Sequence, residues 1–106
     1  MTKEEILALS PGVELNAKVA KEIMGHLVVN DALLGPMVRL VDEDGSTIWH
    51  LPQPYSQDIS VARLVVRRMV EFGCDDARYF AGFGGGIYTE AEAICKAALL
   101  DKREGG

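Results

Sequence analysis

The sequence has few of the residues from which metal sites and disulfide frameworks are built. It contains two cysteines and two histidines among 106 residues. Cys74 and Cys95 lie far apart, outside any Cys-x-x-Cys pattern, and neither has a histidine at zinc-ligand spacing. We therefore expect two reduced thiols, no metal site and no cofactor, as in a protein of the cytoplasm.

Long apolar runs and an excess of basic residues are missing too. No segment reaches the roughly 18 consecutive apolar residues that would suggest a membrane helix, and the first 12 residues include two adjacent glutamates and no signal-peptide core. Eleven basic residues stand against 16 acidic ones, which gives a formal net charge of −5. Such a chain has no uniform basic field for phosphate backbones, so the sequence predicts neither membrane contact nor general nucleic-acid binding.

The common catalytic motifs are absent. The sequence contains no Gly-x-Ser-x-Gly elbow, no P-loop and no His-Glu-x-x-His pair. Residues 82–86 are rich in glycine, but they lack the spacing of nucleotide-binding loops and favour a flexible hairpin turn. We therefore name no catalytic residue and expect a protein that is not an enzyme.

The composition is that of an ordinary globular domain. Hydrophobic residues make up 48% of the chain and charged residues 25%. A chain of this length supports one modest core. The sequence predicts a single domain over residues 1–106, with its core within about 11–100 and a frayed tail over 102–106.

Apolar residues recur at helical spacing in three segments. The first runs from Pro11 to about Met24, the second from Ile59 to about Phe72, and the third follows a capping box at Thr89. A shorter helical turn follows Thr2. Cys95 falls on the apolar stripe of the third helix, which favours a role as a small core residue.

Two segments alternate as strands do. Met37–Val41 and Thr47–Leu51 flank the turn residues 42–45 and predict a hairpin. Residues 30–36 are expected to form a loop, and 77–83 with 87–88 a second, shorter hairpin. The fold class is therefore α+β, in the order α-ββ-α-ββ-α, with a small antiparallel sheet layered against three main helices.

Four stretches resemble a small family of phage and prophage proteins, the phage ABA sandwich domain family. They are Pro11–Leu15, Val19–Gly25, Pro54–Ile59 and Ala93–Leu99, in the family's order. The resemblance implies an α/β/α sandwich and a place in the cytoplasm of a bacterial host. It implies no reaction, because the family is defined by its fold.

One polar run offers a candidate ligand site. Tyr55, Ser56 and Asp58 lie at the expected start of the second helix, where free N–H groups favour an anion, and Arg63 and Arg67 follow. The favoured interpretation is structural, because serine and aspartate cap helices and a preceding tyrosine packs against them. A small nucleotide-like anion is the alternative.

A second candidate lies on the hairpin. Trp49 and His50 are neighbours and point to opposite faces of a strand, so one of them is expected to be exposed. We favour a core position for Trp49, with a stacking platform as the alternative. His50 is the best candidate for a general base if the chain is a hydrolase.

These observations rank three functions. The first is a non-catalytic accessory protein of a phage that binds a host or phage protein, interferes with a host process and forms a homo-oligomer. The second is binding or sequestration of a small anionic ligand by Tyr55, Ser56, Asp58, Arg63 and Arg67. A small hydrolase is the least favoured.

Overall fold

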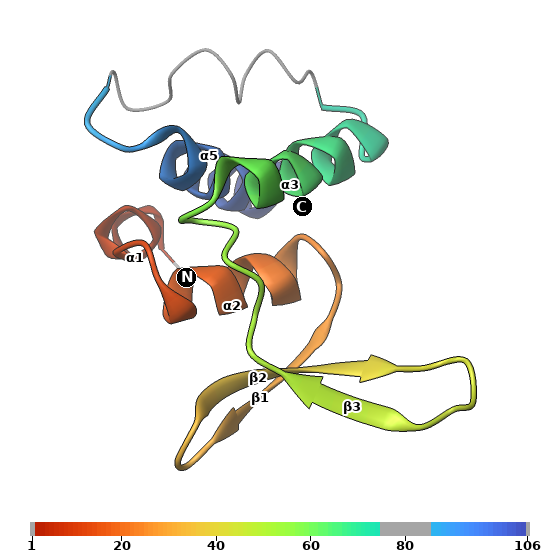
Figure 1. Cartoon of the computed structure of the whole chain (residues 1–106). Coiled ribbons are helices and arrows are strands. Elements are labelled where there is room, and N and C mark those ends of the chain that lie inside the picture. Colours follow the sequence, from red (N-terminus) through yellow and green to blue (C-terminus); the bar gives the residue numbers. More distant parts are fainter. Residues whose placement is uncertain (1, 75–85, 106) are drawn as a thin grey trace.

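The computed structural model describes residues 2–74 and 86–105 (Figure 1). These residues form an α+β fold, as the sequence predicts. The helices are α1 (Lys3–Ala8), α2 (Val13–Glu22), α3 (Ile59–Glu71) and α5 (Glu90–Gly105), and the strands are β1 (Leu27–Asp31), β2 (Gly35–Val41) and β3 (Thr47–His50).

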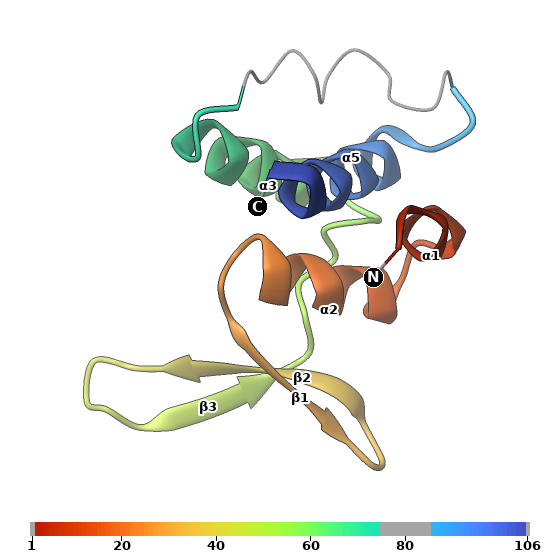
Figure 2. The ribbon, with the colours of Figure 1, turned by 180° about the vertical axis from the view of Figure 1, so that it is seen from behind.

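The described elements form three layers, and the sheet is one of the two outer layers. Figures 1 and 2 show α3 and α5 on one side of α1 and α2, and the sheet on the other side. The main contacts of the sheet with helices are those of β1 and β2 with α2, while α5 packs on α1, α2 and α3. Among residues 2–74 and 86–105, helices cover only one face of the sheet, so the order of layers there differs from the expected sandwich.

The segment between α2 and β2 is mostly strand, and the loop expected over residues 30–36 is wrong. β1 pairs with β2 in antiparallel register from Leu27 opposite Arg39 to Asp31 opposite Gly35. Asp31 closes the turn because its Oδ1 accepts the N–H groups of Leu33 and Leu34, at 2.8 and 2.9 Å. Pro36 is tolerated in β2 because the pairing with β3 begins only at Val38.

The hairpin of β2 and β3 is confirmed. The two strands pair from Val38 opposite His50 to Val41 opposite Thr47. The turn is fixed by Asp42, whose Oδ1 accepts the N–H groups of Asp44 and Ser46, and Gly45 has a φ of +82° there. β3 ends one residue before the predicted Leu51, ahead of Pro52.

The hydrophobic core lies between the helical layers. The expected helices are confirmed with small shifts at their ends, and Thr2 forms its predicted capping box with Glu5. In the described strands only Val38 is fully buried. Most of the core comes from α2, α3 and α5, whose buried residues include Leu15, Val19, Ala62, Val65, Met69, Ile94, Cys95 and Ala98.

The predicted second hairpin lies only partly within the described residues. Its expected strand at 77–83 lies outside the described residues, as do Gly84 and Gly85. Ile87 and Tyr88 are described and form a bend rather than a strand, so that part of the prediction is wrong. At the other end, α5 continues to Gly105 where the sequence predicts a frayed tail from residue 102.

Candidate binding surface on the sheet

In the part of the chain that the structure describes, no helix packs on the face of the sheet that points away from α2. Successive residues of a strand point to opposite faces, and Val28 and Val38 pack toward the core. Their neighbours in each strand therefore point outward. We call this side the outer face and define it by Leu27, Val29, Asp31, Met37, Arg39, Val41 and Trp49.

The outer face is largely apolar and exposed. Leu27 is 48% exposed, Val29 46% and Trp49 45%. The core position expected for Trp49 is therefore wrong, because the layer that would have covered it lies on the opposite side of the sheet. The solvent-exposed face of an antiparallel sheet usually carries polar side chains. A contiguous apolar patch on such a face is typical of an interaction site.

A hollow of about 350 Å³ lies in the outer face. Val29, Met37 and Trp49 line it together with Leu34 from the β1–β2 turn, and Asn30 and Asp31 form its polar rim. The N–H groups of Leu34 and Leu33 donate to the Asp31 carboxylate and hold its pKa below the ordinary value. The hollow is thus a mainly apolar depression with one carboxylate that stays ionised at neutral pH.

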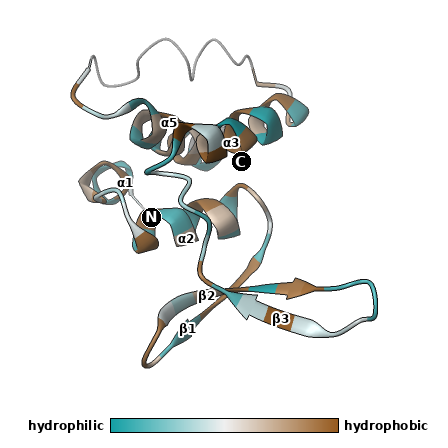
Figure 3. Ribbon diagram, in the orientation of Figure 1, coloured by the Kyte–Doolittle hydropathy of each residue, from teal (hydrophilic) through white to brown (hydrophobic). Residues whose placement is uncertain are grey.

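The turn end of the β2–β3 hairpin projects beyond α2, as both ribbon views show (Figures 1 and 2). Leu40 and Ile48 lie opposite each other there, on the face toward the helices, yet they are 42% and 49% exposed. Val41 is exposed on the outer face of the same segment. Figure 3 shows hydrophobic residues on β2 and β3 in this region, so the projecting end is apolar on both faces.

The predicted site at Tyr55, Ser56 and Asp58 is part of the framework of the fold. Tyr55 and Ser56 are fully buried. Asp58 caps α3, because its Oδ1 accepts the N–H of Ser60 at 2.9 Å. The favoured structural interpretation of this run therefore agrees with where the structure places these side chains.

Ser56 is held in a hydrogen-bond network with α2. Its hydroxyl donates to Asn16 Oδ1 at 2.6 Å and accepts the N–H of Gly12 at 3.0 Å. Asn16 Oδ1 also accepts the N–H of Ser56, and Asn16 Nδ2 donates to Gln57. With these partners, the Ser56 hydroxyl serves to join the start of α2 to the turn before α3.

The three arginines of α3 differ in exposure and in their partners. Arg63 and Arg67 are exposed on the surface of α3, whereas Tyr55 and Ser56 are buried. Arg68 is engaged: its Nη1 lies 3.1 Å from Glu71 Oε2, and its Nε donates to the carbonyl of Ile23. The structure therefore does not gather the arginines around the predicted anion site.

His50 occupies the inner side of β3, partly buried. Its Nδ1 lies 2.6 Å from the Leu51 carbonyl, so this nitrogen carries the proton, and its Nε2 is buried without a hydrogen-bond partner. Burial, with contributions from His50 and Arg68, lowers the pKa of His26. No hydroxyl or carboxylate of the described residues is hydrogen-bonded to His50, so the hydrolase hypothesis gains no support from this residue.

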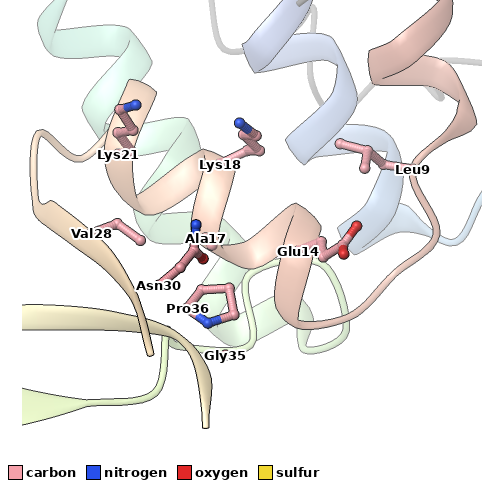
Figure 4. A pocket seen from close by; sticks show the side chains of 9 residues that line it. All are labelled: Leu9, Glu14, Ala17, Lys18, Lys21, Val28, Asn30, Gly35 and Pro36. Atoms are coloured by element: carbon pink, nitrogen blue, oxygen red, sulfur yellow. The ribbon is translucent and has the colours of Figure 1, made fainter. Parts of the chain in front are cut away.

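A cavity of about 540 Å³ lies between α2 and the strands (Figure 4). Its apolar lining includes Ala17, Val28 and Pro36. Lys18 and Lys21 lie at its rim on α2, three residues apart and therefore on one side of the helix. Neither lysine was among the predicted site residues, because the spacing Glu14, Lys18, Lys21 is that of an ordinary solvated helix face.

The strand pattern contained a signal for the outer face. Alternation places Leu27 with Val29 on one face of β1 and Met37 with Arg39 on one face of β2. The pairing register then brings these residues and Trp49 to the same side of the sheet. What the alternation does not tell is which side the helices cover.

Three comparisons with known proteins found no match. No protein-family model matches this chain, and neither a curated protein nor a solved structure does. The resemblance to the phage ABA sandwich domain family stays a prediction. Among residues 2–74 and 86–105, no helix is both long and apolar enough to cross a membrane, and no group of three or more potential metal ligands comes together.

Proposed function

We propose that this protein is a protein-binding module and that its outer face is the binding surface. The single observation that carries the proposal is the exposure of Trp49 with Leu27 and Val29 on a sheet face that none of the described helices covers. Exposed tryptophan beside aliphatic residues and a hollow is the pattern from which binding hot spots are made. The role as a phage accessory protein that interferes with a bacterial host is part of the proposal and is supported by the resemblance alone.

The distribution of buried residues between helices and strands supports this proposal. The helices hold a continuous core, and the sheet contributes only Val38 to the fully buried residues. The apolar residues of the strands are therefore largely free to meet another protein. Burial of apolar area that is already ordered in paired strands costs little conformational entropy on binding.

The test compares two exposed valines. Val29 on the outer face and Val70 on α3 are both 46% exposed, so Val29→Ser and Val70→Ser remove similar areas from different surfaces. We expect Val29→Ser alone to weaken capture of specific partners from a bacterial lysate, measured by quantitative mass spectrometry. Val29→Ser combined with Trp49→Ser should reduce capture at least about tenfold. Val70→Ser should leave capture unchanged, and equal capture by all variants would refute the proposed surface.

A small anionic ligand remains a second candidate, at a different place from the one predicted. The cavity beside α2 has the size typical of small-molecule sites, and the two lysines Lys18 and Lys21 outnumber the one carboxylate, Glu14, in its lining. The test is thermal unfolding with nucleoside monophosphates and inorganic phosphate. Stabilisation that Lys18→Met with Lys21→Met abolishes, but Lys3→Met does not, would support it, and no shift with any of these compounds would refute it.

A further inference from the structure

The outer face carries one cation and one carboxylate at separate places. Arg39 is exposed in the middle of β2 and has no ion pair with any residue of 2–74 or 86–105. Asp31 lies at the end of β1, at the rim of the hollow. In the strand register Arg39 is opposite Leu27 and Asp31 is opposite Gly35, so about 13 Å along the strands separates the two charges.

This separation exceeds the reach of the arginine side chain and prevents Arg39 from pairing with Asp31 of its own chain. It suits a second copy instead, because a two-fold dimer brings the same surface together twice and satisfies every contact in duplicate. Consider an axis that runs between the two outer faces at the level of Met37, parallel to the sheets and perpendicular to the strands. It places Arg39 of one copy opposite Gly35 of the other, beside Asp31 of that copy.

The remaining charges of the sheet favour this antiparallel arrangement over a parallel one. Asp42, Glu43 and Asp44 lie together at the β2–β3 turn. If the strands of two packed sheets ran parallel, these acidic turns would lie against each other and repel. In the antiparallel arrangement each acidic turn passes beyond the β1–β2 turn of the other copy, and Val41 comes opposite Leu33, which is 94% exposed.

The dimensions allow the contact. Packed sheets lie about 10 Å apart, a distance across which an arginine side chain reaches the facing surface. The apolar residues of the outer face and the adjoining turn expose on the order of 600 Å² per copy, which approaches the roughly 800 Å² that each partner buries in a standard interface.

We propose that the outer face binds a second copy of this chain in a two-fold dimer, in which Arg39 of each copy pairs with Asp31 of the other and Trp49 becomes buried. The inference rests on the proposed function, since it names the partner of the same surface. The apolar contacts supply most of the affinity, and the two ion pairs fix the orientation.

The charges can be exchanged to test the pairing. Arg39→Asp sets two carboxylates against each other in both contacts, and Asp31→Arg sets two guanidinium groups against each other, so each variant alone should dimerise at least about tenfold more weakly than the unchanged chain. When the two variants are mixed, the aspartate introduced at position 39 of one copy faces the arginine introduced at position 31 of the other. The unchanged Arg39 and Asp31 face each other in the second contact, so both contacts of the heterodimer join opposite charges. We therefore expect a heterodimer in the mixture by sedimentation equilibrium, whereas Arg63→Asp, a matched change on α3, should dimerise normally.

Trp49 supplies a second readout, because it is the only tryptophan in the sequence. Its emission should shift to the red when dilution dissociates the dimer and exposes the indole ring to water. Because the Arg39→Asp variant dimerises more weakly, its emission should already be red-shifted at concentrations at which the unchanged chain is still dimeric. If the loss of the Asp31 turn contacts prevents Asp31→Arg from folding, Arg39→Asp decides alone, and dimerisation as strong as that of the unchanged chain would overturn the pairing.

The outcomes separate this inference from the proposed function. A chain that stays monomeric at all concentrations, but captures another protein in a Trp49-dependent manner, overturns the dimer and leaves the function intact. A dimer insensitive to both Trp49→Ser and Arg39→Asp overturns the dimer interface. If Trp49→Ser changes neither the capture of other proteins nor dimerisation, both the proposed function and the dimer are overturned.

Discussion

The buried ion pair of α5 leads to a stability prediction that can be worked through in detail. Lys96 Nζ lies 2.6 Å from Glu92 Oε2 and donates to the carbonyl of Leu7 at 2.9 Å. The Lys96 side chain is 2% exposed and that of Glu92 11%. The ammonium also lies 4.2 Å from the centre of the Tyr88 ring. Lys96 thus joins α5 to the end of α1 with its charge removed from water.

Replacing Lys96 by methionine keeps most of the volume but leaves Glu92 charged and without this partner. Removing one member of a buried pair costs about 3–5 kcal/mol, a large part of the roughly 5–15 kcal/mol by which a domain is stable. Because a domain of this size loses about 4–8 °C of melting temperature per kcal/mol, we expect Lys96→Met to melt on the order of 20 °C lower.

Thermal unfolding measures the melting temperature and urea unfolding the free energy, both followed by far-ultraviolet circular dichroism, which reports on the helices. The double variant Glu92→Leu with Lys96→Met removes both charges and should recover most of the lost stability, because apolar replacement of a whole buried pair is close to neutral. A loss of less than about 1 kcal/mol for Lys96→Met alone would refute the reasoning.

Three further predictions concern other buried groups. Ser56→Ala removes the hydroxyl that joins Gly12 to Asn16 and should lower the free energy of unfolding by about 1–3 kcal/mol, measured by urea unfolding, with Ser60→Ala as an exposed control. The lowered pKa of His26 means that the unfolded chain takes up this proton first as the pH falls below about 6.5, so stability should decrease from pH 7 toward pH 5.5, and less so in His26→Asn; equal slopes would contradict this. Burial raises the pKa of the Cys95 thiol to about 12, so a thiol reagent at pH 8 should leave Cys95 unmodified until the chain unfolds, which peptide mapping can check.

The helices were predictable because their signals are local. Apolar residues at helical spacing and caps such as Thr2 and Asp58 identify a helix without knowledge of its partners. The interpretation of Tyr55 and Ser56 as structural residues rested on the same local chemistry, and their burial agrees with it.

The sheet was predictable only in part. Gly35 and Pro36 are typical of loops, so the sequence favoured a loop where β2 begins. What decides the structure there is the side chain of Asp31, which closes a short turn, and the absence of β3 beside Pro36. Neither fact can be derived from residue preferences alone.

The order of layers, and with it the candidate surface, required the three-dimensional structure. An apolar stripe shows that a helix is buried, but not against which element. α2 is buried on more than one side: Val19 lies in the helical core, and Ala17 lies toward the strands. That middle position leaves the other face of the sheet open, and it turns Trp49 outward.

The attachment of the sheet mainly through α2 has a consequence for how such a chain can evolve. Substitutions at Leu27, Val29, Arg39 or Trp49 touch little of what holds the helices together. Selection can therefore change the chemistry of the outer face while the helical scaffold keeps its stability.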